Sequence, residues 1–246
     1  MLNKDYNFYL FDIDRTLWSF DKNAKSAIFK LIDQFFLPER FGIEDKEEFF
    51  RRYELINNNL WVKYEVGEID KDFLREARFL HTFKSYFKNA DSENNDYSTN
   101  YKKIKKLSDK FGTAYLEQMT LETVIEPGAE LVLKTLKDRG KKIAVVSNGF
   151  KEVQYRKMKN SKLAEYIDKY IISEEVGFHK PDPRIFKTAI EALNADKSQT
   201  LMVGDNFPLD IEGAQIFGID QYYYNPYKVK NDGGATYEYA TLLDLI

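Results

Sequence analysis

Two aspartates stand directly after the first apolar run of the sequence. The run Phe8–Phe11 is mostly aromatic, which favours a β-strand, and it is followed by Asp12 and Asp14. Because alternate side chains of a strand share one face, the two carboxylates would point the same way just beyond the strand. Two carboxylates held close together need a cation or a shared proton. The pair is therefore the first candidate for chemistry.

Three later apolar runs also end in polar or charged side chains. We expect them to be strands of a parallel sheet, over 142–146, 170–173 and 200–203, and ligands bind at the carboxyl ends of the strands in such sheets. The residues that follow these runs are Ser147, Asn148 and Gly149 after the first, Lys180 after the second, and Asp205 and Asp210 after the third. Four strands would thus bring carboxylates, a hydroxyl, an amide and a lysine to one edge of the sheet.

This set of side chains suits the transfer of a phosphoryl group. Asp12, Asp14 and Asp205 converging on one point would favour a hard cation such as Mg²⁺, which binds carboxylates, water and phosphate oxygens. Lys180 and Ser147 would hold the remaining phosphate oxygens. One carboxylate could then attack phosphorus and form an aspartyl-phosphate, while a second could protonate the leaving alcohol and later activate water.

The stretch between the first strand and the later ones has the periodicity of helices. From residue 21 to about 118 apolar residues recur at helical spacing, and we find no convincing strand there. Asp21 is expected to cap the first helix and Pro38 to stop it. Further helices are expected over 49–64, 73–87 and 101–111, with a polar loop over 89–100.

After Pro127 short apolar strands alternate with helices. Helices are expected over 129–138, 151–167, 182–193 and 210–217, and a fifth strand over 221–224. This alternation is typical of an α/β fold, a parallel sheet covered by helices on both faces. Because the first strand belongs with this sheet, the helical stretch is an insertion. We expect an α/β core domain over 1–17 and 121–246 and a helical domain over 18–120.

Composition excludes several classes of function. The chain has 246 residues, a net charge of -3 and no cysteine, so there is no basic footprint for a nucleic acid polymer and no thiolate chemistry. The first strand begins near residue 6, and no apolar run has the roughly 20 residues of a membrane span. We expect a cytoplasmic protein whose partner is a small phosphorylated metabolite; the oligomeric state stays open.

The motifs at the strand ends resemble those of the haloacid dehalogenase-like hydrolase superfamily, and of its aspartate-nucleophile phosphatases in particular. They read Asp12-Ile-Asp14-Arg-Thr16-Leu, Ser147-Asn-Gly149, Lys180-Pro and Gly204-Asp205-x-x-x-x-Asp210, in the superfamily's order along the whole chain. The resemblance implies a Rossmann-like parallel core with an inserted helical cap of the C1 type. The departures are Arg15, where many members have glycine, and Asn206, where serine or threonine is common.

The same resemblance implies a role for each motif residue. Asp12 would be the nucleophile and a metal ligand, and Asp14 would be the general acid and base and give the metal its backbone carbonyl. Asp205 would complete the Mg²⁺ ligands, with Asp210 supporting the site from behind them or through water. The candidate catalytic residues are Asp12, Asp14, Ser147 and Lys180, and the candidate phosphate-binding residues are Thr16, Ser147, Asn148 and Lys180.

A second resemblance concerns the substrate. The run Leu17-Trp18-x-Phe20-Asp21, Gly204-Asp-Asn and the final Asn225-Pro226 are similar to the branch that removes phosphate from pyrimidine 5'-monophosphates. We therefore expect a Mg²⁺-dependent phosphoric monoester hydrolase, with a nucleoside 5'-monophosphate as the first candidate substrate.

Two alternatives stay open at this point. One is a sugar-phosphate phosphatase or phosphomutase of the same superfamily, which product identification would separate. The other is a phospho-accepting signalling domain that resembles response-regulator receivers, which also combine strand-end aspartates, a hydroxyl and a lysine. The insertion of about a hundred residues argues against the receiver, which has no use for a lid. Taken alone, Asp210 could simply cap its helix.

Overall fold

The chain forms two compact units. The computed structural model describes residues 2–87, 97–231 and 233–246. The first unit comprises Met1–Lys22 and Thr120–Ile246, and the second comprises Asn23–Met119. Whether the second unit serves as a cap stays a prediction.

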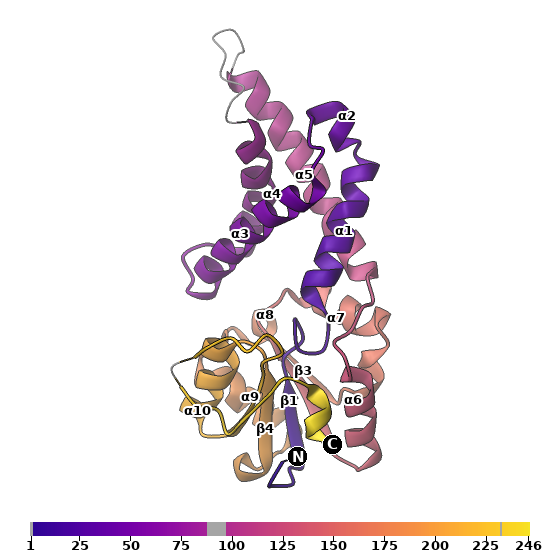
Figure 1. Cartoon of the computed structure of the whole chain (residues 1–246). Helices are drawn as coiled ribbons and strands as arrows, with labels where there is room; N and C mark the ends of the chain where they lie inside the picture. The colour runs from indigo at the N-terminus through magenta and orange to yellow at the C-terminus, as the bar shows by residue number, and fades with distance from the viewer. Residues whose placement is uncertain (1, 88–96, 232) are drawn as a thin grey trace. The chain divides into compact units, whose positions relative to one another are not determined.

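The first unit contains a six-stranded parallel sheet (Figure 1). Its strand order is β3-β2-β1-β4-β5-β6, and every neighbouring pair is parallel. The strands are β1 (Phe8–Phe11), β2 (Lys142–Ser147), β3 (Lys169–Ile172), β4 (Thr200–Gly204), β5 (Asp220–Tyr224) and β6 (Tyr237–Tyr239). The predicted α/β fold with a parallel sheet is confirmed, and the five predicted strands are present with bounds within about a residue of those expected. The edge strand β6 was not predicted.

Helices on both faces of the sheet bury its apolar side chains. One cluster joins strand residues such as Leu10 and Met202 to α9, through Ile185 and Phe186. In Figure 1, α6 lies on the opposite side of the strands from α9. The α-helices of this unit are α6 (Ala129–Asp138), α7 (Lys151–Asn160), α8 (Ser173–Val176), α9 (Pro183–Leu193) and α10 (Gly213–Phe217).

Two helices of this unit differ from the expectation. The helix predicted over 151–167 ends at Asn160 and is followed by the short 3₁₀ segment η1 (Leu163–Tyr166). The helix predicted over 210–217 begins earlier, as the π-helical segment η3 (Phe207–Glu212), which runs into α10. Two further 3₁₀ segments are η2 (Lys197–Gln199) and η4 (Leu242–Leu245). By contrast, Asp182 caps α9 with Pro183 at its start, as predicted.

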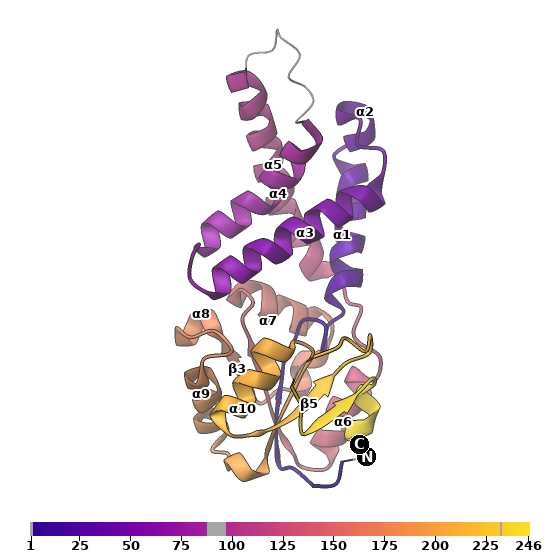
Figure 2. The same cartoon turned by 60° about the vertical axis from the view of Figure 1, so that its left-hand side comes forward.

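The second unit is helical, as predicted, and its core is aromatic. Its helices are α1 (Phe20–Gln34, which begins in the first unit), α2 (Leu37–Phe41), α3 (Lys46–Glu65), α4 (Lys71–Phe87) and α5 (Tyr97–Leu121). Helices α3 and α4 pack side by side (Figure 2). The ring of Phe79 lies 4.9 Å from that of Phe111 and is stacked 5.2 Å from Tyr53.

Three local expectations in this part of the chain are corrected. Asp21 lies inside the first turn of α1, which starts at Phe20, and therefore does not cap it. Pro38 follows α1, as expected, but it also stands in the first turn of α2, where its missing N–H costs nothing. Residues 97–100 of the predicted polar loop are helical, and the rest of that loop lies outside the described residues. Among the described residues no helix is long and apolar enough to cross a membrane.

Candidate active site

The strand order brings the predicted site residues to one edge of the sheet. Strand β1 lies between β2 and β4, with Phe11 paired to Val145 on one side and to Val203 on the other. The backbone N–H of Asp12 donates to the carbonyl of Val203 at 2.9 Å, so the chain leaves β1 directly beside the end of β4. The residues that follow β1, β2 and β4 are therefore neighbours in space.

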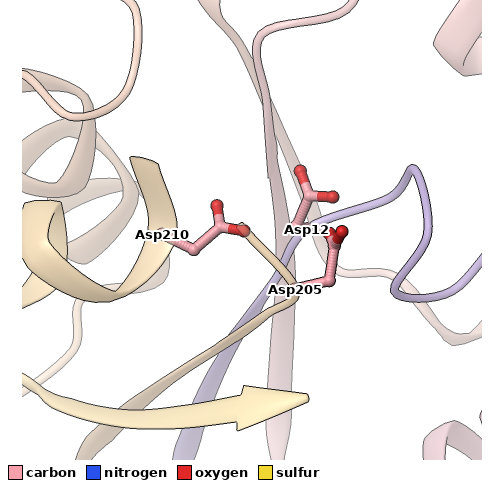
Figure 3. Close-up of side chains that lie close together, drawn as sticks. All are labelled: Asp12, Asp205 and Asp210. Carbon is pink, nitrogen blue, oxygen red and sulfur yellow. The ribbon is translucent and has the colours of Figure 1, made fainter. Parts of the chain in front are cut away.

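Three carboxylates form the centre of this site. One ligand oxygen each of Asp12, Asp205 and Asp210 lies within 4.8 Å of the others (Figure 3). Burial raises the pKa of Asp12 above its ordinary value and, although Lys180 works in the opposite direction, the charge of Asp210 adds to the rise. Burial, followed by the charge of Asp12, raises the pKa of Asp205 as well. A cation would stabilise negative charges that lie this close together, two of them on buried side chains.

Lys180 joins two of these carboxylates. Its Nζ donates to Oδ1 of Asp12 at 2.5 Å and to Oδ1 of Asp210 at 2.7 Å, and its side chain is almost fully buried. Burial alone would lower the pKa of Lys180, but the two carboxylates outweigh it and hold the pKa above its ordinary value. The side-chain amide of Asn148 bonds both the backbone N–H and the carbonyl of Lys180, at 2.7 and 3.0 Å. Asn148 therefore fixes the loop that carries the lysine.

Asp210 sits in space that a glycine provides. A Cβ built on Gly204 would lie 2.2 Å from Oδ2 of Asp210, closer than any side chain could tolerate. The same Oδ2 accepts a hydrogen bond from the backbone N–H of Asn206 at 3.0 Å. Asn206 itself caps η3 by accepting from the N–H of Leu209. Asp210 is not that cap; its buried carboxylate faces Lys180.

Ser147 is the last residue of β2, and its hydroxyl is held in one orientation. Its Oγ accepts hydrogen bonds from the backbone N–H of Gly149 at 3.1 Å and from Nε2 of Gln154 at 2.7 Å. Because these two bonds use both lone pairs of the hydroxyl, its proton is the part left to donate to a phosphate oxygen.

The carboxylate of Asp14 does not belong to the three-carboxylate cluster. Its Oδ1 accepts from Nζ of Lys157 at 2.6 Å, and its Oδ2 accepts from Nε2 of Gln154 at 2.8 Å. Burial lowers the pKa of Lys157, against the pull of Asp14. The prediction that the carboxylates of Asp12 and Asp14 share one cation thus has the geometry against it, whereas a contact through the Asp14 backbone carbonyl stays a prediction.

Sequence reasoning missed Gln154 and Lys157, although α7 carried a signal. The helix buries Val153 and Met158, and these two polar residues share the same buried face. A polar pair within an apolar helix face is unusual, because glutamine and lysine are mostly exposed in proteins. The strand ends alone do not indicate these residues, because they lie on α7, the helix that follows β2.

The remaining residues of the first motif also have defined partners. The buried Thr16 donates from Oγ1 to Oδ1 of Asp205 at 3.2 Å, so its hydroxyl is directed at a carboxylate of the cluster. Arg15 has a φ of 65°, the left-handed region that favours the glycine common at this position. Its guanidinium pairs with Asp21 at 2.7 Å and lies over the ring of Phe20.

Fold and site together define an α/β protein with a centre of buried carboxylates and one lysine at the ends of parallel strands. The chain belongs to the haloacid dehalogenase-like hydrolase family, whose model matches residues 6–218. It is similar to the pyrimidine 5'-nucleotidase PynA of Streptococcus pneumoniae, with 29% identity over 98% of this chain and 94% of that protein. It is also similar to the pyrimidine 5'-nucleotidase YjjG of Escherichia coli, with 31% identity over 87% of this chain and 84% of that protein.

A solved structure of similar fold covers nearly the whole chain. The protein YfnB of Bacillus subtilis, whose crystal structure has magnesium bound, is 25% identical with a TM-score of 0.80, and the match covers 98% of this chain and 97% of that one. The predicted family, the fold class and the prediction that the chain is a hydrolytic enzyme are confirmed. The roles of the individual site residues stay predictions.

Proposed function

We propose that this hydrolase is a Mg²⁺-dependent phosphatase that releases phosphate from a small monoester, with a nucleoside 5'-monophosphate as its first candidate substrate. The observation that carries the proposal is the buried bridge of Lys180 between Asp12 and Asp210, beside Asp205. A nucleophilic carboxylate next to a fixed cation is the arrangement that attack on an anionic phosphate requires.

The three-carboxylate cluster fits a hard divalent cation. Its donors are all oxygens, they lie within 4.8 Å of one another, and burial raises the pKa of both Asp12 and Asp205. These are properties that favour Mg²⁺, which prefers carboxylate and water ligands. Asp12 and Asp205 would hold the ion, with Asp210 nearby, and the bound ion would neutralise charge on the phosphate. The magnesium bound in the similar structure of YfnB supports Mg²⁺ as the cation.

The residues of the chain suffice for a balanced two-step hydrolysis. Asp12 attacks phosphorus, the bond between phosphorus and the alcohol oxygen breaks, and Asp14 gives its proton to that oxygen. Water then attacks the phosphorus of the aspartyl-phosphate, Asp14 takes a proton from the water, and Asp12 is restored as phosphate leaves. Ser147 and Lys180 hold the phosphate oxygens during both steps.

The substrate class rests on the relatives. Two similar proteins are pyrimidine 5'-nucleotidases, and the chain covers most of each, which supports a nucleoside 5'-monophosphate. A sugar phosphate is the second candidate, because the site described above recognises the phosphate group and leaves the alcohol unspecified. A receiver-like signalling domain has no support in a chain that belongs to a hydrolase family.

An assay of phosphate release tests the proposal. Purified protein with Mg²⁺ is screened against nucleoside monophosphates and sugar phosphates, with and without a chelator. We expect turnover on at least one ester, its loss on chelation, and no turnover by Asp12→Asn. The matched control is Asp138→Asn, which removes an exposed carboxylate of α6 and should leave turnover unchanged. An active Asp12→Asn protein would refute the mechanism, and sugar phosphates as the better substrates would replace the nucleotide.

A further inference from the structure

Two polar residues of α7 lie against the second aspartate of the first motif. We propose that Lys157 and Gln154 are positioning residues that fix the carboxylate of Asp14 for proton transfer, an inference that rests on the phosphatase function proposed above. The helix α7 begins four residues after Ser147, so it lies close to the site, yet neither residue belongs to the motifs at the strand ends.

Lys157 is a buried cation whose carboxylate partner is Asp14. Its side chain is 2% exposed, its Nζ lies 2.6 Å from Oδ1 of Asp14, and the same Nζ lies 4.4 Å from the centre of the Trp18 ring. The Asp14 side chain is 25% exposed, so the carboxylate has an open side. Buried ion pairs contribute little net stability compared with apolar residues of the same size. Stability alone is therefore a weak reason for a lysine at this position.

Gln154 connects Asp14 to the predicted phosphate-binding serine. Its Nε2 donates one hydrogen bond to Oδ2 of Asp14 at 2.8 Å and the other to Oγ of Ser147 at 2.7 Å. The two amide protons are thus both used by residues of the site. A Cβ on Gly149 would lie 2.1 Å from this Nε2, so the glycine of the second motif leaves room for the bridge.

Together the two donors determine where the Asp14 carboxylate lies. Each of its oxygens has one fixed partner, which prevents rotation about the terminal bond and keeps the group apart from the cluster around Asp12. The two aspartates of the first motif are therefore held by different buried lysines, Asp12 by Lys180 and Asp14 by Lys157. This separates the group that attacks phosphorus from the group that moves protons.

The experiment compares leaving groups. In p-nitrophenyl phosphate the leaving phenolate is stable without a proton, whereas an alkyl phosphate needs one. We measure kcat/KM, which covers the steps up to departure of the alcohol, for p-nitrophenyl phosphate and for the alkyl ester that the screen finds best. The variants are Lys157→Met and Gln154→Met, whose side chains keep a similar length, and the control is Lys159→Met, an exposed lysine on the same helix.

For Lys157→Met we expect kcat/KM on the alkyl ester to fall at least about tenfold, within the range of general acid catalysis, and that on p-nitrophenyl phosphate to fall less than about threefold. Gln154→Met also frees Ser147, so both values should fall, with the greater loss on the alkyl ester. Equal losses on both esters, or no loss on either, would overturn the inference. Lys159→Met should match the wild type on both. Thermal unfolding identifies a variant that fails to fold, in which case the other variant decides the question.

A second measurement separates positioning from packing. In an Asp14→Asn background, Lys157→Met should change kcat/KM on the alkyl ester less than about twofold, because there is no carboxylate left to position. A loss of about tenfold in that background, as large as in the wild-type background, would show that Lys157 does not act through Asp14. If the wild type hydrolyses neither ester with Mg²⁺, the proposed function fails and this inference with it. An active wild type with insensitive variants refutes the inference alone.

Discussion

At the scale of single residues, the site depends on side chains that occupy the space beside a glycine. Gly204 leaves room for Asp210, and Gly149 leaves room for Gln154. Gly149 is the glycine of the second motif, and a larger residue there would displace the amide that holds Ser147.

Replacing Gly204 should therefore impair both stability and activity. In Gly204→Ala the new methyl group must displace the Asp210 carboxylate, which accepts from Lys180 and from the Asn206 backbone. We expect a loss of about 1–3 kcal/mol in the free energy of unfolding and a fall of about tenfold or more in phosphate release, because the lysine shifts. Denaturant titration and the phosphate assay measure the two effects. In the control, Gly234→Ala, a Cβ meets no atom within 4 Å, and the same loss there would contradict the steric argument.

Arg15 gives a second prediction at this scale. Its backbone is left-handed, a conformation that costs most residues about 1–2 kcal/mol but suits glycine. Arg15→Ala keeps that strain and loses the partly exposed pair with Asp21, whereas Arg15→Gly loses the pair and relieves the strain. We expect the glycine variant to be more stable than the alanine variant by roughly 0.5–1 kcal/mol. Chemical denaturation of both proteins tests this, and the reverse order would refute it.

At the scale of elements, the sheet is tied to a helix by one carboxylate. Asp168, just before β3, accepts two hydrogen bonds at 2.8 Å from Nζ of Lys137 on α6 and one at 2.8 Å from the backbone N–H of Ile143 on β2. Burial works to raise the pKa of Asp168, but Lys137 and the Ile143 amide outweigh it and hold the pKa below its ordinary value. The folded state therefore favours the ionised carboxylate.

This contact makes the stability of the protein depend on pH in a defined direction. Because the pKa is lower in the folded chain, the stabilisation is fully present above the ordinary value of 3.8 and is lost as the pH falls through the folded value. We expect Asp168→Asn to cost about 1–2 kcal/mol near neutral pH. Its deficit relative to the wild type should shrink in denaturation curves below about pH 4. A deficit that grows on acidification would contradict the assigned contact.

Much of the fold could be predicted because its signals are local. The strand β2 contains a continuous apolar run over 143–146, and the cap of α9 is an Asp182-Pro183 pair that needs no tertiary contact. The strand Tyr237–Tyr239 escaped prediction because three residues show too little periodicity and pair in parallel with a strand formed earlier in the chain. The π-helical segment η3, which precedes α10, was also not predicted. Its residue Asp210 contacts Lys180, and such a tertiary contact leaves no signal in the local sequence.

The site residues likewise fall into those with a local signal in the sequence and those that depend on tertiary contacts. Asp12, Ser147, Lys180 and Asp205 could be named from the sequence because each follows a strand, and parallel strands end at the same edge. The position of a residue at a strand end does not show which neighbouring side chains it contacts. Asp14 contacts α7 and stays apart from the carboxylate cluster, and that depends on two helical residues a hundred and forty or more positions away.

At the scale of the whole molecule, metal binding should couple to stability. Three crowded carboxylates, of which Asp12 and Asp210 are buried, have one lysine between them and are under-neutralised, so a bound cation would favour the folded state. Mg²⁺ should raise the midpoint of thermal unfolding, with a stabilisation of about 2.7 kcal/mol when free Mg²⁺ exceeds its dissociation constant about a hundredfold. Differential scanning calorimetry with and without a chelator measures the shift.

A matched pair of variants tests where the cation acts. Asp205→Asn removes one carboxylate of the cluster and should abolish most of the Mg²⁺-induced shift, whereas Asp138→Asn should keep it. An equal shift in all three proteins would mean that Mg²⁺ binds elsewhere in the chain.

The close approach of Gly149 to Gln154 also constrains which substitutions this chain can accept during evolution. A side chain at 149 and a long side chain at 154 compete for one volume, so a harmful substitution at the first position can be compensated at the second. We expect Gly149→Ala to be poorly folded and the pair Gly149→Ala with Gln154→Ser to recover its thermal midpoint without recovering activity. Sequences that descend from a common ancestor with this protein should therefore vary at the two positions together.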